Sequence, residues 1–118
     1  MPDRKAKSQA AYLHDMLEAS RLVRQYTQGV LFEEFGVNPE KRDAVAMRLT
    51  VLGESACRID PPTEAALSSI PFKRIRGLRK RTAHDYGAVD LRIVWAVVQE
   101  EMEPLIAALE AYLDRPIR

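Results

Sequence analysis

The chain has 118 residues, of which 47% are hydrophobic and 30% are charged, and its formal net charge is +1 at pH 7. This length is typical of one domain, residues 1–118, and the near-neutral balance excludes a global field that draws nucleic acid to the whole surface. A lone cysteine, Cys57, excludes an internal disulfide, and no apolar run approaches the roughly 20 residues of a membrane span. We therefore expect a cytoplasmic protein without membrane contact. A domain this small leaves apolar surface to bury, which favours a homodimer.

The first predicted element is an amphipathic helix. Residues 1–8 are polar and basic, and we expect them to fray. The apolar residues that follow recur at alternating steps of four and three, which is the spacing of one helix face. This face consists of Tyr12, Met16, Ala19, Val23, Tyr26 and Val30, and Gly29 and Gly36 bracket its end.

A second helix is predicted to begin at Asn38, a capping residue that is followed by Pro39 and an acid. Its apolar positions are Val45, Leu49, Leu52, Ala56 and Ile59. The sequence Asp60-Pro61-Pro62 must end this helix, because proline lacks the amide hydrogen and disfavours helix at the residue before it. Thr63 is then expected to cap a short turn.

The second half of the chain is also predicted to be helical. Pro71 starts a segment whose apolar residues are Phe72, Ile75 and Leu78, and residues 84–87 are expected to form a break. From about Asp90 another apolar stripe begins, and Pro104 is expected to bend or restart the chain within it. No segment shows sustained two-residue alternation. The sequence therefore predicts an all-α fold, an up-and-down bundle of four to five helices joined by short loops.

The segment from Arg79 to Tyr86 carries the chemistry that phosphodiester cleavage needs. An arginine keeps its charge at any working pH and fits a phosphate with two parallel hydrogen bonds. A histidine, His84, can give or take a proton near neutrality. One group can therefore move protons while the other stabilises charge on the phosphoryl oxygens. Without further context, the favoured interpretation of His84 is a helix C-terminal cap, and the alternative for Tyr86 is a residue at the end of a bundle.

Positive charge is concentrated just before this segment. Six cations stand within nine residues: Lys73, Arg74, Arg76, Arg79, Lys80 and Arg81. Such a run is either a solvated helix face or a track for the RNA backbone. The RNA-binding residues predicted on the second interpretation are Lys73, Arg74, Arg76 and Arg81.

Several segments match a known family in order along the chain. They are Tyr12-Leu13-His14-Asp15-Met16-Leu17, Phe35 with Arg42-Asp43-Ala44-Val45, Leu52-Gly53-Glu54-Ser55-Ala56, Ile70-Pro71-Phe72, Ile75-Arg76-Gly77-Leu78-Arg79, and Asp90-Leu91 with Val94-Trp95. Arg79, His84 and Tyr86 satisfy a pattern of arginine, four residues, histidine, one residue, tyrosine. From about Tyr12 to Tyr112 the chain resembles the HepT-like branch of the HEPN domains, which are ribonuclease toxins paired with a minimal nucleotidyltransferase.

The resemblance implies a helical bundle that dimerises with two motifs facing each other across a cleft. It implies metal-independent RNA cleavage without a cofactor, with Arg79 and His84 as catalytic residues. It further implies an antitoxin, a minimal nucleotidyltransferase, that silences the toxin by transferring AMP to Tyr86. One position departs from the family pattern, because Lys80 stands where an asparagine usually follows the motif arginine. Lysine removes an amide that donates and accepts, and it adds a cation.

Three further residues are predicted to support the site. Gly53 would let two helices approach closely, so that Glu54 pairs with Arg79 and orients it; the alternative is a surface ion pair. Asp85 is either solvated or holds the ring of His84 by a hydrogen bond. Lys80 alters the charge of the site. Only two histidines, far apart, accompany the single cysteine, so no metal site is predicted.

Two other functions stay open at this point. A bundle that lost turnover with the asparagine would bind RNA, or another protein, without cleaving it. A purely structural partner of the nucleotidyltransferase would neither bind nor cleave RNA.

Overall fold

The computed structural model describes residues 7–83 and 88–114, and the side chains of 80–83 and 88–90 are outside the description. Every regular element in these residues is a helix, which confirms the predicted all-α fold. The helices are α1 (Gln9–Thr27), α2 (Phe32–Gly36), α3 (Pro39–Ala56), α4 (Pro61–Ala66), α5 (Phe72–Ala83) and α6 (Ala88–Leu113). Four are long and two, α2 and α4, have five and six residues.

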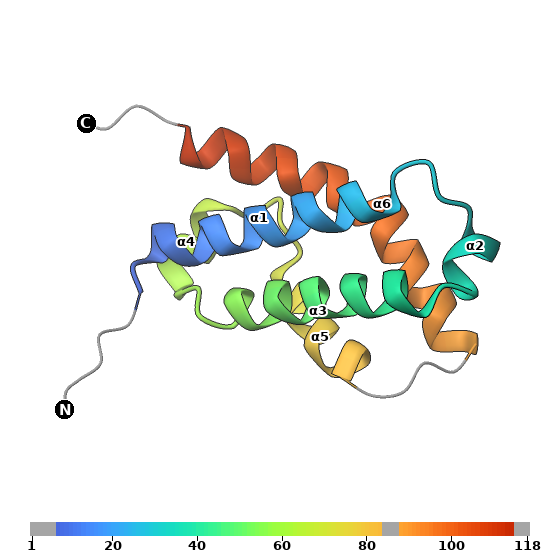
Figure 1. Cartoon of the computed structure of the whole chain (residues 1–118). Coiled ribbons are helices and arrows are strands. Elements are labelled where there is room, and N and C mark those ends of the chain that lie inside the picture. Colours follow the sequence, from blue (N-terminus) through green and yellow to red (C-terminus); the bar gives the residue numbers. More distant parts are fainter. Residues whose placement is uncertain (1–6, 84–87, 115–118) are drawn as a thin grey trace.

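The long helices form the bundle. α1 packs along both α3 and α6, and α5 packs across α3 and also contacts α6 (Figure 1). The start of α1, the end of α3 and α4 lie at one end of the molecule, while α2 lies at the other. This arrangement buries the predicted helix faces against one another.

The core is apolar and is drawn from all four long helices. Its largest fully buried side chains include Leu13, Met16, Val23, Phe35, Val45, Leu49, Leu52, Ile75, Leu78, Val94, Met102 and Leu109. Burial of each such side chain contributes about 1.5–3 kcal/mol. The predicted α1 face is confirmed at Met16, Ala19 and Val23, whereas Tyr12 and Tyr26 are only partly buried at its two ends.

α1 is shorter than the sequence predicted. Ser8 caps its start by accepting a hydrogen bond from the Ala11 N–H at 3.0 Å. The helix ends at Thr27 instead of Val30, because Gly29 adopts a φ of 74°, in the left-handed region that stops a right-handed helix. α2 was not predicted at all. Glu34 secures its start by accepting from the Leu31 N–H at 2.8 Å.

α3 begins where the sequence predicted but ends earlier, at Ala56, so Ile59 is buried beyond the helix and Asp60-Pro61-Pro62 is not what stops it. Asn38 accepts from the Lys41 N–H at 3.0 Å, as expected of an N-cap. The short element that begins at Pro61 is α4, but Asp60 caps it, not Thr63. The Thr63 N–H donates to Asp60 Oδ1 at 2.9 Å, because two prolines in the first turn place Thr63 at the position a capping carboxylate reaches.

α6 is one helix through Pro104, so the chain does not restart there. A proline in a helix interior costs about 3 kcal/mol. Here Met102, Leu105 and Ile106 are buried on both sides of it, while Pro104 itself is exposed. Core packing therefore holds the two halves in one helix, which curves along its length in Figure 1.

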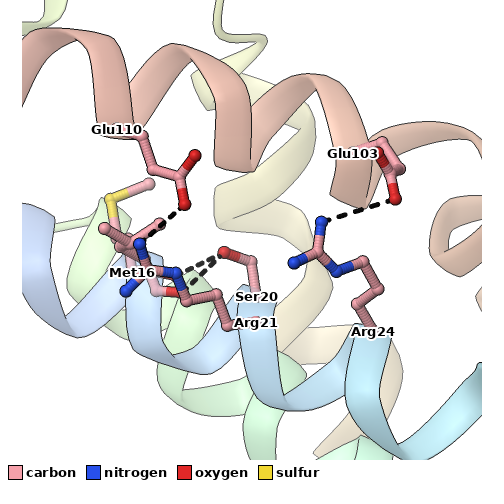
Figure 2. Close-up of polar contacts among 7 residues, drawn as sticks. Met16, Ser20, Arg21, Arg24, Glu103 and Glu110 are labelled. Atoms are coloured by element: carbon pink, nitrogen blue, oxygen red, sulfur yellow. Dashed lines mark hydrogen bonds and ion pairs between the residues drawn. The ribbon is translucent and has the colours of Figure 1, made fainter.

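Surface ion pairs tie α1 to α6. Arg21 bonds Glu110 at 2.6 Å, and Arg24 bonds Glu103 at 3.4 Å (Figure 2). Ser20, buried between them, turns its hydroxyl back onto the Met16 and Leu17 carbonyls. Exposed pairs of this kind contribute about 0–1 kcal/mol each, so the apolar seam beneath them determines how α1 and α6 pack.

Candidate functional site

Arg79 lies on α5, the most cationic helix of the described chain. α5 buries Phe72, Ile75 and Leu78, three residues spaced by three, and this spacing turns Arg79 toward solvent. Its side chain is exposed, although its backbone is packed against another helix. Arg79 therefore combines a fixed backbone with a guanidinium that can reach a ligand.

The packing partner of Arg79 is Gly53 on α3. A Cβ placed on Gly53 would lie 2.9 Å from the backbone nitrogen of Arg79, 3.1 Å from its Cβ and 3.2 Å from the Ile75 carbonyl oxygen. Real Cβ atoms do not approach backbone this closely, so α3 and α5 can cross here only because residue 53 is glycine. The predicted close approach at Gly53 is confirmed, and it fixes where Arg79 enters the site.

Glu54 and Arg79 line one pocket, of about 570 Å³, between α1, α3 and α5. Among the described side chains no ion pair joins the two, so the predicted pairing is not found here. The reason is geometric: Glu54 follows the contact residue Gly53 by one, and 100° of rotation carries its side chain away from the crossing line.

The same pocket contains residues that the sequence analysis did not assign to a site. They include Lys7, Tyr12, Asp15, Ser55 and Arg58. A partial signal was present, because Val51, Glu54, Ser55 and Arg58 stand at positions i, i+3, i+4 and i+7 and thus share one face of α3 and the turn after it. Nothing local indicated that α1 would bring Tyr12 to that face.

The basic run on α5 is partly neutralised within the chain. Arg76 pairs with Glu64 of α4 at 2.9 Å, and Arg74 pairs with Glu101 of α6. Lys73 is exposed and forms no ion pair with any described side chain. An RNA track along α5, which stays a prediction, would thus rely more on Lys73 than on Arg74 or Arg76.

The remaining predicted site residues fall outside the description. His84, Asp85 and Tyr86 lie outside the described residues, as do the side chains of Lys80 and Arg81. α5 itself continues through Ala83. The helix therefore carries the chain from Arg79 to the residue before His84.

Within residues 7–83 and 88–114, no group of three or more His, Cys, Asp or Glu side chains lies together in a way that could hold a metal ion. In the same ranges, no helix has the length and apolar character needed to cross a membrane.

Comparison with known proteins gives a consistent family. Residues 16–112 match the model of the family described as Ribonuclease HepT-like. A probable ribonuclease HepT of Thermococcus cleftensis is 29% identical over 104 residues, which cover 88% of this chain and 94% of that protein. A putative RNase of Methanocaldococcus jannaschii is 32% identical over 117 residues, covering 93% of this chain and 94% of the relative. A putative RNase of Caldanaerobacter subterraneus is 26% identical, covering 92% and 97%. No solved structure matches the chain significantly.

Proposed function

Because the chain belongs to the HepT-like ribonuclease family, we propose that it is a toxin that cleaves RNA internally without a metal ion. The observation that carries this proposal is the family match over residues 16–112, a range that includes Arg79, His84 and Tyr86. The exposed side chain of Arg79, whose backbone packs against Gly53, supports it. We expect the protein to act in the cytoplasm, because its proposed substrate, RNA, is found there.

RNA supplies its own nucleophile in this reaction, the 2′-hydroxyl. His84 takes the proton of that hydroxyl as the oxygen attacks phosphorus and forms a 2′,3′-cyclic phosphate. The bond from phosphorus to the 5′-oxygen breaks, and this leaving oxygen needs a proton. Arg79 stabilises the charge that gathers on the phosphoryl oxygens.

One His84 cannot be base and acid in the same step. A second copy of the chain, with its motif facing the first across a cleft, supplies the other imidazole. The active species in this proposal is therefore a homodimer in which both copies contribute to each site.

Control of the toxin would act on Tyr86. A minimal nucleotidyltransferase antitoxin transfers AMP from ATP: the phenol oxygen bonds to the α-phosphorus, pyrophosphate leaves, and the phenol loses its proton. The added phosphate brings bulk and negative charge close in sequence to Arg79 and His84, where it competes with RNA for the cations.

The decisive experiment incubates purified protein with total RNA in excess chelator. We expect cleavage by wild type and none by His84→Ala, with unchanged helical circular dichroism. His14→Ala is the matched control, because His14 is the other histidine and is exposed on α1. Cleavage that survives in His84→Ala would overturn the assignment.

A second candidate function is favoured by Lys80, which replaces the asparagine usual in the family. In this alternative the bundle binds RNA in a salt-sensitive manner without cleaving it. The same assay with Lys80→Asn separates the two: a silent wild type that gains cleavage in this variant would identify a site that has lost turnover.

A further inference from the structure

The pocket beside Arg79 is built by segments far apart in the sequence. Val51, Glu54, Ser55 and Arg58 contribute one wall from α3 and the turn after it, and Tyr12 contributes the other from α1. A pocket of about 570 Å³ is within the roughly 300–1,000 Å³ range of small-molecule sites. Arg79 lines it as well, so the pocket opens next to the arginine that the proposed reaction uses.

A side-chain amide fixes the two walls relative to each other. Gln9 Nε2 donates to the Arg58 carbonyl at 3.0 Å, and Gln9 Oε1 accepts from the Asp60 N–H at 2.8 Å. One residue at the start of α1 therefore holds the backbone of the turn after α3 at two points. This clamp fixes the backbone of Arg58, a residue that lines the pocket.

The charges of the pocket are divided into two groups. Lys7 and Asp15 pair with each other at 2.7 Å, and Lys7 lies 5.9 Å from the centroid of the Tyr12 ring. Glu54, Arg58 and Arg79 form no ion pair with any described side chain. One carboxylate and two guanidinium groups thus face the pocket without neutralising one another.

We propose that this pocket binds a guanine nucleotide of the RNA strand, the one adjacent to the cleaved phosphodiester bond. The inference rests on the proposed function for the identity of the strand, and it adds a base preference to it. Glu54 receives the base, Tyr12 stacks on it, and Arg58 binds the phosphate on the side away from Arg79. Single-stranded RNA is recognised in this way, by stacking on aromatic rings and by hydrogen bonds to exposed base edges.

Guanine is selected because the ionised carboxylate of Glu54 accepts hydrogen bonds and has none to donate. The Watson–Crick edge of guanine presents two adjacent donors, N1–H and N2–H, which match the two oxygens of a carboxylate. Adenine and cytosine each present one donor beside an acceptor, and uracil flanks its single donor with two acceptors. An acceptor facing Glu54 is repelled, so the other three bases bind less well.

Tyr12 and Arg58 supply affinity in this site without selecting the base. Tyr12 is partly buried, and its ring offers a stacking surface. Lys7 is exposed and sits at the outer limit of a cation–π contact, so an incoming base displaces it at little cost. Arg58 and Arg79 then hold consecutive phosphates of the strand.

The first test measures binding separately from cleavage. The four 3′-nucleoside monophosphates are titrated into wild type and followed by NMR of the backbone amides. We expect 3′-GMP to bind at least about tenfold more tightly than the others, with shifts in the start of α1 and the end of α3. Glu54→Gln should abolish the preference, because an amide presents a donor as well as an acceptor. Glu18→Gln, an exposed glutamate of α1 outside the pocket, is the control.

Two substitutions of Tyr12 show whether its aromatic ring or its hydroxyl group provides the affinity. Tyr12→Phe should keep the affinity for 3′-GMP, whereas Tyr12→Ala should lower it by about tenfold without changing the order of the bases. Equal binding of all four nucleotides by wild type, or an unchanged preference in Glu54→Gln, would overturn the proposal.

The second test sequences the ends of cleaved RNA fragments. Wild type should cut next to guanine, and Glu54→Gln should cut with no base preference whatever its rate. Because the readout is preference, a general loss of activity in the variant does not imitate the result. Selective 3′-GMP binding without any cleavage would support the pocket and refute the nuclease, while cleavage without selectivity would do the reverse.

Discussion

Two glycines twenty-four residues apart show how differently the two sides of α5 are used. At the crossing with α3, the space beside Gly53 is occupied by the Arg79 backbone, and an added Cβ would collide with it at 2.9 Å. On the other side, a Cβ added to Gly77 would meet no described atom within 4 Å. Gly77 lines an open depression with Pro71, Lys73 and Arg74.

The difference separates a requirement of the fold from a property of the surface. Gly53 is needed so that α5 can lie against α3 and deliver Arg79 to the pocket. Gly77 weakens its helix, since glycine loses more backbone freedom than other residues, and no described packing offsets that cost. Substitutions at both glycines and at nearby charged residues should therefore differ in size and sign.

Gly53→Ala should destabilise the fold by about 1–3 kcal/mol, because the new methyl forces the α3 and α5 backbones apart. It should also displace Arg79 and lower RNA cleavage beyond what unfolding explains. Urea unfolding with activity measured well below the transition checks both effects. An unchanged midpoint would mean that the crossing has room for an added methyl group.

Gly77→Ala is the matched change on the open side and should act with the opposite sign. We expect a gain of about 0.5–1 kcal/mol from helix propensity alone. Thermal unfolding measures it. If stability rises while cleavage falls, the face around Gly77 requires a close backbone approach by RNA or by a second copy of the chain.

Substitutions of Lys73 and Arg76 compare an unpaired surface cation with one that is already paired within the fold. Lys73→Gln should weaken RNA binding several-fold and reduce the salt dependence of binding by about one unit of slope. Arg76→Gln should change binding less, because Glu64 already occupies its guanidinium at 2.9 Å. Anisotropy titrations with labelled RNA at several salt concentrations compare them. Equal effects would mean that the Arg76–Glu64 pair opens in the complex.

Substitution of Asp60 should have the smallest effect on stability, and only at acidic pH. Hydrogen bonds from Thr63, through its side chain and then its backbone, lower the pKa of Asp60 below its ordinary value of 3.8. Because this pKa is lower in the folded state, the Asp60 carboxylate contributes its full stabilisation above pH 3.8. That contribution is lost as the pH falls through the folded-state pKa. Asp60→Asn keeps a capping side chain without the titration, so its stability should fall less between neutral pH and about pH 2. Parallel acid-induced loss in both proteins would contradict this.

Local rules predicted most of the helices but not their tertiary details. The spacing of apolar residues identified α1, α3, α5 and α6, and Asn38 marked the start of α3. α2 was not predicted, because it depends on a side-chain bond from Glu34 to the Leu31 N–H and on burial of Phe35 in the core. Thr63 was predicted as a cap, whereas Asp60 caps α4. The sequence left a restart at Pro104 open, because burial on both sides of that residue is invisible in a local window.

In the candidate site, too, some features could be predicted from the sequence and others could not. Spacing and resemblance predicted Arg79, His84 and Tyr86 as motif residues, and their roles stay predictions. The close helix approach predicted at Gly53 is confirmed. The partners of the charged groups were not predictable. Arg74 and Arg76 pair with acids 27 and 12 residues away, and Glu54 shares a pocket with Arg79 without an ion pair.

The sequence by itself determined the helical character, the apolar faces, the motif and the family, because each is encoded by residues a few positions apart. The tertiary structure alone decided what fills the space beside Gly53, which acid meets each arginine, and that Tyr12 stands across a pocket from Glu54. These contacts depend on the angle and depth at which helices cross. That geometry results from packing the whole core, which no short segment specifies.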